Sequence, residues 1–327
     1  MSSFNPTLSA PAPIPSLSSA TDTAPVAVTP AAFGITDIGL LVMAVIWGVN
    51  YSVVKYGLRT VAPLSFTAIR LMASTLILLV LAALVRDARA PSRRDVMALL
   101  GIGLIGNGLY QLLFIVGLSQ TRAGIAALVV AASPAWVAII SRILGRERAS
   151  RRGWAGIALQ LVGVASVVLS SNVMDGQRSA FLGTFLIVCG SIMWSLYSVL
   201  LQPYTERVHP LHLSAITLGS GAIMMLILAS PGLMTLDVHT VGTSGWLALT
   251  YSALGAMVFA YLLYYRGIRV LGPTRTALYG NLQPVVAIGV AWFALSEAPT
   301  IWQWIGTTFI MGGLLLSRTA TMKTPHE

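Results

Sequence analysis

The sequence predicts an all-α integral membrane protein of ten transmembrane helices, arranged as two inverted-topology repeats of five helices each. Three observations lead to this fold class: an apolar composition, long apolar runs without alternation, and a repeat in the order of rare residues. Of 327 residues, 56% are hydrophobic and only 9% are charged, whereas a soluble domain carries about 25% charged residues. This composition excludes a soluble enzyme, a nucleic-acid-binding protein and a disordered chain.

Apolar stretches long enough to cross a bilayer recur along the chain. A membrane-spanning helix needs about 20 mostly apolar residues. Continuous runs favour helices, because the strands of a membrane barrel alternate between apolar and polar residues. The connections are too short for a soluble domain. The ten predicted spans are residues 38–54, 64–85, 96–118, 123–141, 154–170, 180–201, 211–230, 245–265, 276–296 and 301–317.

The two ends of the chain differ from the spans. Residues 1–36 contain six of the sixteen prolines and no Lys or Arg. This composition predicts a disordered tail and not a secretory signal, which would begin with a basic region. Residues 319–327 are expected to form a second, short tail.

The basic residues predict the orientation, because cytoplasmic loops of membrane proteins are enriched in Lys and Arg. If the N-terminus is cytoplasmic, the inner side holds 15 of the 20 basic residues and the outer side holds four. The remaining one, Arg70, lies within the second span. Both termini are therefore expected in the cytoplasm. The net charge of +10 is then a positive-inside bias and not a signal for nucleic-acid binding.

A repeat divides the chain into residues 37–171 and 179–318, each with five predicted spans. Matches of Trp, Pro and Glu in one order are much less expected by chance than matches of Gly or Ala. An offset of 150 pairs Pro134 with Pro284, Glu147 with Glu297, Trp154 with Trp304, Gly156 with Gly306 and Gly163 with Gly313, and an offset of 147 pairs Trp47 with Trp194 and Pro63 with Pro210.

Five helices per half is an odd number, so the second half enters the membrane from the opposite face. Inverted repeats of this kind are typical of secondary transporters, which bind their substrate near the midplane and open alternately to each side. The repeat therefore predicts a substrate site between the halves.

Several short motifs carry a family likeness. They are Trp47-Gly48-Val49-Asn50 and Lys55, then Pro63, Phe66 and Arg70, Ser133-Pro134, the turn Leu144-Gly145-Arg146-Glu147, and Gln283-Pro284 with Glu297. In this order they resemble the drug/metabolite transporter superfamily, in its EamA branch of ten-helix carriers. The second half departs from the first at two positions, with Gln202 and Thr217 in place of Lys55 and Arg70.

The resemblance implies an inner-membrane carrier of a small metabolite, with export of amino acids or related metabolites as the expected activity. An importer or a drug efflux carrier of the same fold is the alternative. An intramembrane enzyme would need a nucleophile and a base at membrane depth, and a structural or signalling protein would not need matched prolines and glutamates. The substrate, the direction, the energy source and the choice between monomer and homodimer stay open.

Arg70 is the one charged residue well inside a predicted span. Burying a lone cation in a membrane costs about 2.5 kcal/mol or more, so such a residue faces a cavity or a partner. One interpretation is a cation that binds a carboxylate or phosphate of the substrate. The other is a side chain that extends from near the helix start to the outer interface.

Polar and aromatic residues inside the spans are the other candidates for a substrate cavity. Aromatic walls with scattered amides suit a small molecule with an apolar body and a polar head. Each aromatic ring could instead pack between helices or lie at the membrane interface. The full candidate set is Trp47, Asn50, Tyr51, Arg70, Asn107, Tyr110, Gln111, Trp194, Tyr197, Tyr261, Asn281 and Gln283.

Pro134 and Pro284 occupy matching positions in the fourth and ninth spans. Proline removes a backbone hydrogen bond and bends a helix, so both are candidates for a hinge or gate, with a fixed bend as the alternative. The repeated glycines Gly156, Gly163, Gly306 and Gly313 are expected to permit close helix packing.

Other chemistry is not predicted. The single cysteine, Cys189, excludes a disulfide framework and a Cys-based metal site. We expect no catalytic residue, no metal site and no cofactor, and no ATP-binding loop occurs. All ten acidic residues lie outside the predicted spans, whereas many proton-coupled carriers use a buried carboxylate. This pattern favours uniport, exchange, or proton coupling through something other than a membrane carboxylate.

Overall fold

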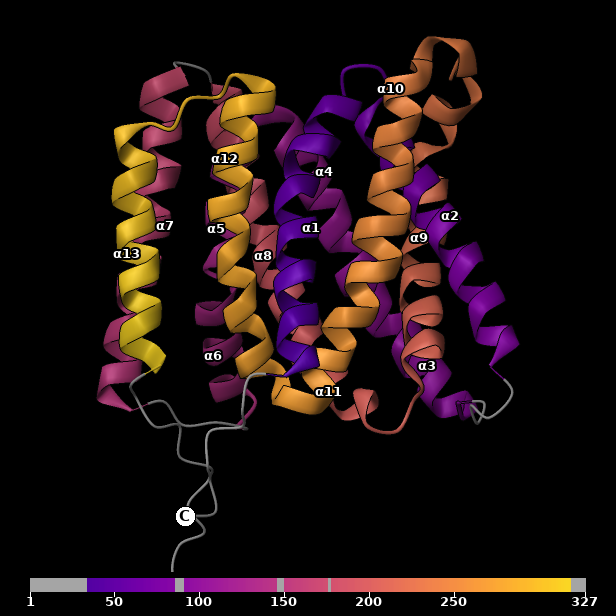
Figure 1. Ribbon diagram of the computed structural model, residues 1–327, viewed down its shortest axis with the longest axis horizontal. Helices are drawn as coiled ribbons and strands as arrows, with labels where there is room; N and C mark the ends of the chain where they lie inside the picture. Colours follow the sequence, from indigo (N-terminus) through magenta and orange to yellow (C-terminus); the bar gives the residue numbers. More distant parts are fainter. Residues whose placement is uncertain (1–33, 86–90, 146–149, 176–177, 319–327) are drawn as a thin grey trace, which may run out of the picture. The chain divides into compact units, whose positions relative to one another are not determined.

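A computed structural model describes residues 34–85, 91–145, 150–175 and 178–318. Over these residues the secondary structure is helical, and the helices lie side by side in one bundle (Figure 1). Eight continuous helical stretches are long and apolar enough to cross a membrane. Two shorter apolar helices, Gly280–Leu295 and Ile301–Leu316, lie at the ninth and tenth predicted spans. The all-α prediction is confirmed for the described residues.

The helices are joined by short connections, and some follow one another without a break. In chain order the elements are α1 (Ile35–Gly57), α2 (Pro63–Leu84), α3 (Arg93–Gly103), η1 (Leu104–Leu109), α4 (Tyr110–Gln120), α5 (Ala123–Ala131), α6 (Ser133–Ile143), α7 (Arg151–Asp175), α8 (Arg178–Thr205), α9 (Pro210–Met234), α10 (Val238–Thr250), η2 (Tyr251–Phe259), α11 (Ala260–Tyr279), η3 (Gly280–Leu282), α12 (Gln283–Leu295) and α13 (Ile301–Arg318).

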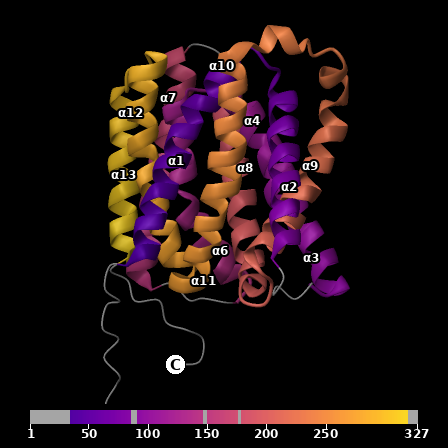
Figure 2. The ribbon, with the colours of Figure 1, turned by 45° about the vertical axis from the view of Figure 1, so that its right-hand side comes forward.

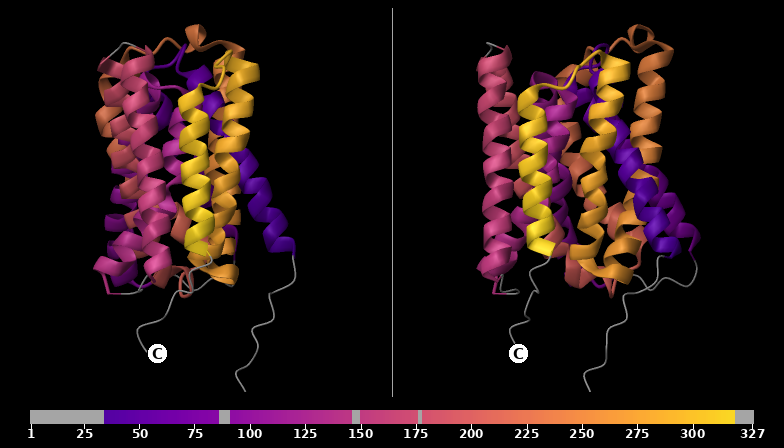
Figure 3. Two further views of the ribbon diagram at one scale, coloured as in Figure 1. Left: turned by 90° about the vertical axis from the view of Figure 1, so that its left-hand side faces the viewer. Right: turned by 60° about the vertical axis from the view of Figure 1, so that its left-hand side comes forward.

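Helices far apart in the sequence pack along each other. The most extensive contacts join α2 to α9 and α7 to α13. Figure 2 shows α2 beside α9, and Figure 3 shows α13 beside α7. The helix α1 packs against α12 and against α10, η2 and α11, while α8 packs against α4 and α6. Thus α1 and α8 each have neighbours on several sides.

Glycines set the close approach of α7 and α13. A Cβ added at Gly313 would lie 2.5 Å from the carbonyl oxygen of Gly156, and one at Gly163 would lie 3.0 Å from the carbonyl oxygen of Gly306. Both distances are too short for an ordinary contact, so a side chain at either position would push the helices apart. The predicted packing role of these glycines is confirmed.

Two helical stretches contain π-helical segments, which the sequence did not indicate. They are η1 and η2, and each continues an α-helix on both sides. A π-helix has wider turns than an α-helix and shifts the register of the residues that follow. The first residue of η2, Tyr251, follows the first residue of η1, Leu104, by 147 residues. This is the same offset that relates Trp47 and Trp194.

The predicted bends at the two prolines are present as helix breaks. The break between α5 and α6 falls at Ala132, two residues before Pro134. The 3₁₀ turn η3 lies between α11 and α12 and ends two residues before Pro284. Each proline lies in the first turn of the helix after the break, where its missing N–H is tolerated. A hinge motion at these breaks stays a prediction.

The first helix begins earlier than predicted, at Ile35. Thr36, which the sequence places in the disordered tail, is therefore helical, and Asp37 lies in the first turn. The Asp37 carboxylate accepts a hydrogen bond of 2.8 Å from the backbone N–H of Gly34. Acidic side chains stabilise helix N-termini, so this helix extends past the apolar run that hydropathy detects.

Asp95 is a second acidic residue in a first turn, because α3 begins at Arg93. The prediction that every acidic residue lies outside the membrane helices is therefore wrong for Asp37 and Asp95. Residues 1–33 and 319–327 of the predicted tails, and the turn with Glu147, lie outside the described residues.

Candidate functional site

The bundle contains two adjoining pockets. The first, here called the arginine pocket, has a cavity volume of about 70 Å³. The second, here called the hydroxyl pocket because Ser133, Ser141, Ser198, Tyr264 and Thr276 line it, also has a cavity volume of about 70 Å³. The arginine pocket is lined by Trp47, Asn50, Tyr51, Arg70, Tyr110, Gln111, Phe114, Val130, Trp194, Ala256, Met257, Tyr261 and Gln283.

Trp47 of α1 and Trp194 of α8 lie at the boundary of the two pockets, since both line each of them. Their ring centroids are 6.0 Å apart with an interplanar angle of 87°, an edge-to-face arrangement that aromatic pairs favour. The indole N–H of Trp47 donates a 2.9 Å hydrogen bond to the carbonyl oxygen of Ala256, which fixes the ring. Val130 and Gln283 complete the boundary.

Arg70 of α2 is 1% exposed and is the one charged residue among the described residues that line these pockets. Its Nη1 donates to Oγ of Ser252 at 3.0 Å, and its Nη2 donates to Oε1 of Gln111 at 2.8 Å. Its Nε is buried and has no hydrogen-bond partner. The guanidinium carbon lies 5.7 Å from the ring centroid of Phe66. The side chain faces the pocket and does not extend to the outer interface.

Asn50 of α1 belongs to the same polar cluster. Its Oδ1 accepts a 2.8 Å hydrogen bond from the hydroxyl of Ser252, which in turn accepts from Arg70. These bonds join α1, α2 and η2 through neutral dipoles, which stabilise a buried cation without removing its charge. Ser252 escaped prediction because small hydroxyl residues occur throughout the spans, and its role depends on contacts between helices.

Aromatic rings form the other walls of the arginine pocket. The ring centroid of Trp194 lies 5.1 Å from that of Tyr110 and 5.9 Å from that of Tyr261. The rings of Tyr51 and Phe114 are 5.6 Å apart. The pocket therefore has one cationic end and apolar, aromatic flanks.

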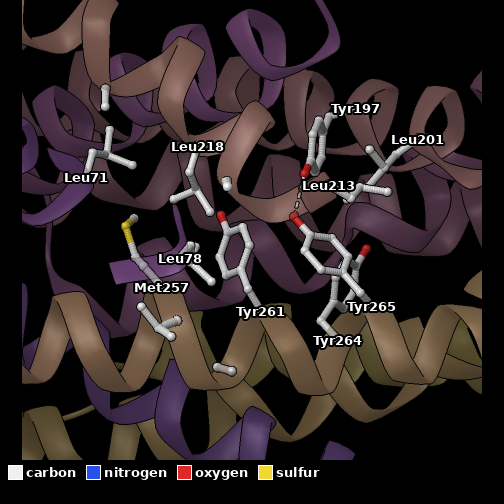
Figure 4. Close-up of a cluster of buried hydrophobic side chains, with 14 of the residues drawn as sticks. Leu71, Leu78, Tyr197, Leu201, Leu213, Leu218, Met257, Tyr261, Tyr264 and Tyr265 are labelled. Atoms are coloured by element: carbon white, nitrogen blue, oxygen red, sulfur yellow. Dashed lines mark hydrogen bonds between the residues drawn. The ribbon is translucent and has the colours of Figure 1, made fainter. Parts of the chain in front are cut away.

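Asn107 and Tyr197 are predicted site residues that line neither pocket. Both are fully buried. Oδ1 of Asn107 accepts a 3.1 Å hydrogen bond from the Tyr261 hydroxyl, and the hydroxyls of Tyr197 and Tyr265 are 2.7 Å apart. Figure 4 shows Tyr261, Tyr264 and Tyr265 projecting from one helix, with the Tyr265 hydroxyl meeting that of Tyr197. Asn107 lies in η1, whose wider turns remove it from the helix face of the α4 candidates.

The structure brings the other ten candidates to the pockets. Nine of them line the arginine pocket, and the tenth, Asn281, lines the hydroxyl pocket. Pro134 lines the hydroxyl pocket too, and Pro284 is buried beside Gln283. The lining residues that sequence reasoning missed include Phe114, Val130, Ser133, Ser198, Ala256, Met257, Tyr264 and Thr276.

Lys55 and Glu297 form hydrogen bonds to backbone groups at helix ends and line neither the arginine pocket nor the hydroxyl pocket. Nζ of Lys55 donates to the carbonyl oxygens of Leu118, at 2.9 Å, and of Thr121. A Glu297 carboxylate oxygen accepts a 3.0 Å hydrogen bond from the backbone N–H of Ala123, the first residue of α5. Backbone groups at helix ends lack partners within the helix, so both side chains have structural roles. In the described part of the chain, His, Cys, Asp and Glu form no cluster that could hold a metal.

These features define the class of the protein. It is a helical membrane protein whose bundle encloses a pocket with one buried cation, amide groups and aromatic walls. Such a pocket can hold a small molecule with an apolar body and a polar end.

The chain belongs to the EamA-like transporter family, whose profile matches residues 34–169 and 181–319. The predicted resemblance is confirmed, and the protein is a membrane transporter and not an enzyme. The chain is 28% identical to YedA of Escherichia coli (strain K12), described as an uncharacterized inner membrane transporter, over 85% of this chain and 88% of the relative. It is 26% identical to the uncharacterized transporter YyaM of Bacillus subtilis, over 84% and 91%.

A third relative carries a more specific name. The chain is 27% identical to a "probable amino-acid metabolite efflux pump" of Salmonella typhimurium, over 85% of this chain and 92% of the relative. A solved structure titled "Crystal structure of protein" matches with a TM-score of 0.63 at 20% identity, over 87% of this chain and 97% of that chain. At this identity the likeness shows the fold alone.

Proposed function

We propose that the protein is a secondary transporter that moves a small metabolite by alternating access between two inverted repeats of five helices. Export of amino acids or related metabolites is the expected activity, in keeping with the name of the Salmonella relative. Import, or drug efflux by the same fold, is the alternative. The observation that carries the proposal is that Trp47 and Trp194, which match in the repeat, meet at the boundary of two pockets.

Further pairings support a two-fold relation between residues 37–171 and 179–318. Exchanging the halves at the offset of 150 turns the contact between Gly156 and Gly313 into the contact between Gly306 and Gly163. The helix breaks before the two prolines and the two π-helical segments also recur at matching positions. Unrelated helices would not place the same irregularities at the same offsets.

The pockets suggest how access would alternate. A molecule crossing the bundle would pass from the arginine pocket to the hydroxyl pocket between Trp47 and Trp194. The helix after each proline break packs on a tryptophan helix, α6 on α8 and α12 on α1. Bending at either break would therefore shift the boundary between the pockets, as alternating access requires.

Replacing Pro284 with alanine tests this hinge. Alanine restores a backbone N–H and permits a straighter helix. We expect a large loss of efflux, measured in cells. The thermal stability of the purified protein should change little. Efflux equal to that of the wild type would contradict a hinge at this position.

The proposed orientation places both termini in the cytoplasm of a bacterial-type cell, with the protein in the inner membrane. It rests on the 15-to-4 distribution of basic residues. A fusion of alkaline phosphatase, which is active only outside the cytoplasm, to the C-terminus is expected to be inactive. An active fusion would reverse the orientation.

A metabolite panel tests the transport function. Efflux is compared between cells overproducing the wild type, the Asn50→Ala, Arg70→Ala double variant, and an Arg207→Gln control. Arg207 forms an ion pair of 2.9 Å with Asp95 outside both pockets. We expect at least one metabolite to leave faster with the wild type and the control but not with the double variant. Equal efflux in all three would contradict the assignment of the pocket.

We propose that transport is driven by substrate gradients, through uniport or exchange, and not by a proton gradient. One carboxylate does lie within a membrane helix, because Asp37 is 2% exposed in α1 and accepts a hydrogen bond from the Tyr279 hydroxyl. The described lining of both pockets is nevertheless free of Asp and Glu. Transport in proteoliposomes is therefore expected to be unaffected by a pH gradient at zero membrane potential. Acceleration by the gradient would refute this, and an Asp37→Asn variant would then test that carboxylate.

A further inference from the structure

We infer that the arginine pocket binds the carboxylate of an aryl-alkyl acid without an amino group, in preference to the matching amino acid. This inference rests on the proposed transport function and narrows its expected substrates, amino acids and related metabolites, to related acids that lack the amino group. Three properties of the pocket lead to it: a cation without a counter-ion, an unused hydrogen-bond donor, and the lack of an anionic partner for an ammonium group.

The positive charge of Arg70 has no counter-ion in the pocket. Its hydrogen-bond partners, Ser252 and Gln111, are neutral. Asp and Glu do not occur among the described residues that line either pocket. A charge buried without a counter-ion is strongly disfavoured in a protein and in a membrane. An anion bound here would complete the site without displacing an acidic side chain.

The Arg70 guanidinium has donors to spare. Of its five N–H groups, one on Nη1 and one on Nη2 are used, and the buried Nε–H has no partner. A carboxylate accepts two parallel hydrogen bonds from one edge of a guanidinium, and the edge that includes Nε offers this fork. A phosphate dianion would bring two negative charges to a lining that offers one cation. The single charge of a carboxylate matches it.

The remaining walls favour an aromatic body. Trp194, Tyr110 and Tyr261 form a connected set of rings, and Val130 and Met257 add apolar surface. A cavity of about 70 Å³ has room for about five to seven water molecules, at about 10–15 Å³ each, which is enough for a ring with a short chain. One ring with a short chain would place its ring among these side chains and its carboxylate at the arginine.

An amino group finds no anionic partner among the described residues that line this pocket. It would lie near the charge of Arg70, and the amide oxygens on that side already accept hydrogen bonds: Oδ1 of Asn50 from Ser252, and Oε1 of Gln111 from Arg70. Attraction between an ammonium and the ring faces is weaker than the cost of burying an unpaired cation. A zwitterion would leave the site with a net positive charge, whereas a monoanion makes it neutral.

Four probes with one phenyl ring test this inference: 3-phenylpropionate, L-phenylalanine, 2-phenylethylamine and methyl 3-phenylpropionate. Their binding to the purified full-length protein is measured by isothermal titration calorimetry at neutral pH. We expect 3-phenylpropionate to bind about tenfold or more tightly than the amino acid, the amine and the ester, because a hydrogen bond to a charged group contributes about that factor.

Two substitutions of Arg70 locate the preference. Arg70→Gln is expected to bind the acid and the ester equally, and Arg70→Lys, which keeps the charge but not the fork, is expected to fall between. Arg207→Gln is the matched control and should keep the full preference. Size-exclusion chromatography checks that each variant folds. If Arg70→Gln does not fold, the comparison of acid and ester on the wild type decides the matter.

The inference fails if L-phenylalanine or the ester binds as tightly as the acid, if none of the four probes binds, or if the preference survives in a folded Arg70→Gln variant. Its failure is distinct from that of the transport proposal. Efflux of a metabolite of another class would keep the transport proposal and remove this inference. Binding of the acid without any efflux in the panel would do the reverse.

Discussion

Replacing Gly313 with alanine tests the close packing of α7 and α13. The new Cβ would lie 2.5 Å from the carbonyl oxygen of Gly156 and 2.8 Å from the backbone nitrogen of Gln160. Ordinary contacts begin at 3.4 Å, so the helices must separate by about 0.9 Å. Backbone atoms cannot rotate away, and overpacking of this kind costs about 1–3 kcal/mol. The higher helix propensity of alanine recovers little of this, since membrane helices stay formed when their packing is lost.

Gly312, the preceding residue, is the matched control. A Cβ there would meet Leu159 Cδ2 at 3.7 Å, an ordinary contact. We expect Gly312→Ala to change the free energy of unfolding by no more than about 0.5 kcal/mol, and Gly313→Ala to lower it by about 1–3 kcal/mol. Both are compared by thermal unfolding of the purified protein in one detergent. Equal melting temperatures for the two variants would refute the close approach at Gly313.

Two further predictions concern single hydrogen bonds. Tyr261→Phe keeps the ring but leaves the buried Oδ1 of Asn107 without its donor. We expect this to lower the free energy of unfolding by about 1–3 kcal/mol, measured by the same thermal unfolding. An unchanged melting temperature would contradict the hydrogen bond. Burial above all lowers the pKa of His209, whose Nδ1 accepts from the backbone N–H of Leu211 at 3.3 Å. The fold favours the neutral ring, so the contribution of His209 to the free energy of unfolding should be fully present above the ordinary pKa of about 6.5 and be lost as the pH falls. The variant His209→Asn keeps a capping acceptor and should show a weaker pH dependence of the melting temperature.

Much of the candidate site could be predicted because a membrane restricts where polar side chains can lie. An amide that faces lipid is penalised, so Asn50 and Asn281 were expected to face the interior of the bundle, whereas Arg70 could equally have extended to the outer interface. The repeat added Trp47 and Trp194 as a matched pair. Hydropathy, self-comparison and the polar and aromatic residues of the spans therefore indicated the helices and most of the lining of the arginine pocket.

The rest depends on contacts that a helix period does not encode. Asn107 would share a helix face with Tyr110 and Gln111 only if the third span were a regular α-helix, and η1 changes that register. Ser252 became part of the site through its bonds to two other helices. Asp37 was placed outside the membrane helix because hydropathy marks the apolar run and not the polar first turn.

The two halves are not equal at the position that would set the substrate's orientation. In the proposed repeat, Arg70 of α2 matches Thr217 of α9. The Thr217 hydroxyl donates to the carbonyl oxygen of Leu213 within its own helix at 2.8 Å and accepts from the Tyr197 hydroxyl at 3.4 Å, so it carries no charge that needs a partner. Arg70 instead depends on two other helices. Stability alone would favour a neutral residue there, because a charge buried without a counter-ion is costly. We therefore expect the charge to serve binding: it would hold the anionic end of the substrate on α2 in both open states, so that release depends on weakening one set of bonds and not on transfer between two equivalent sites.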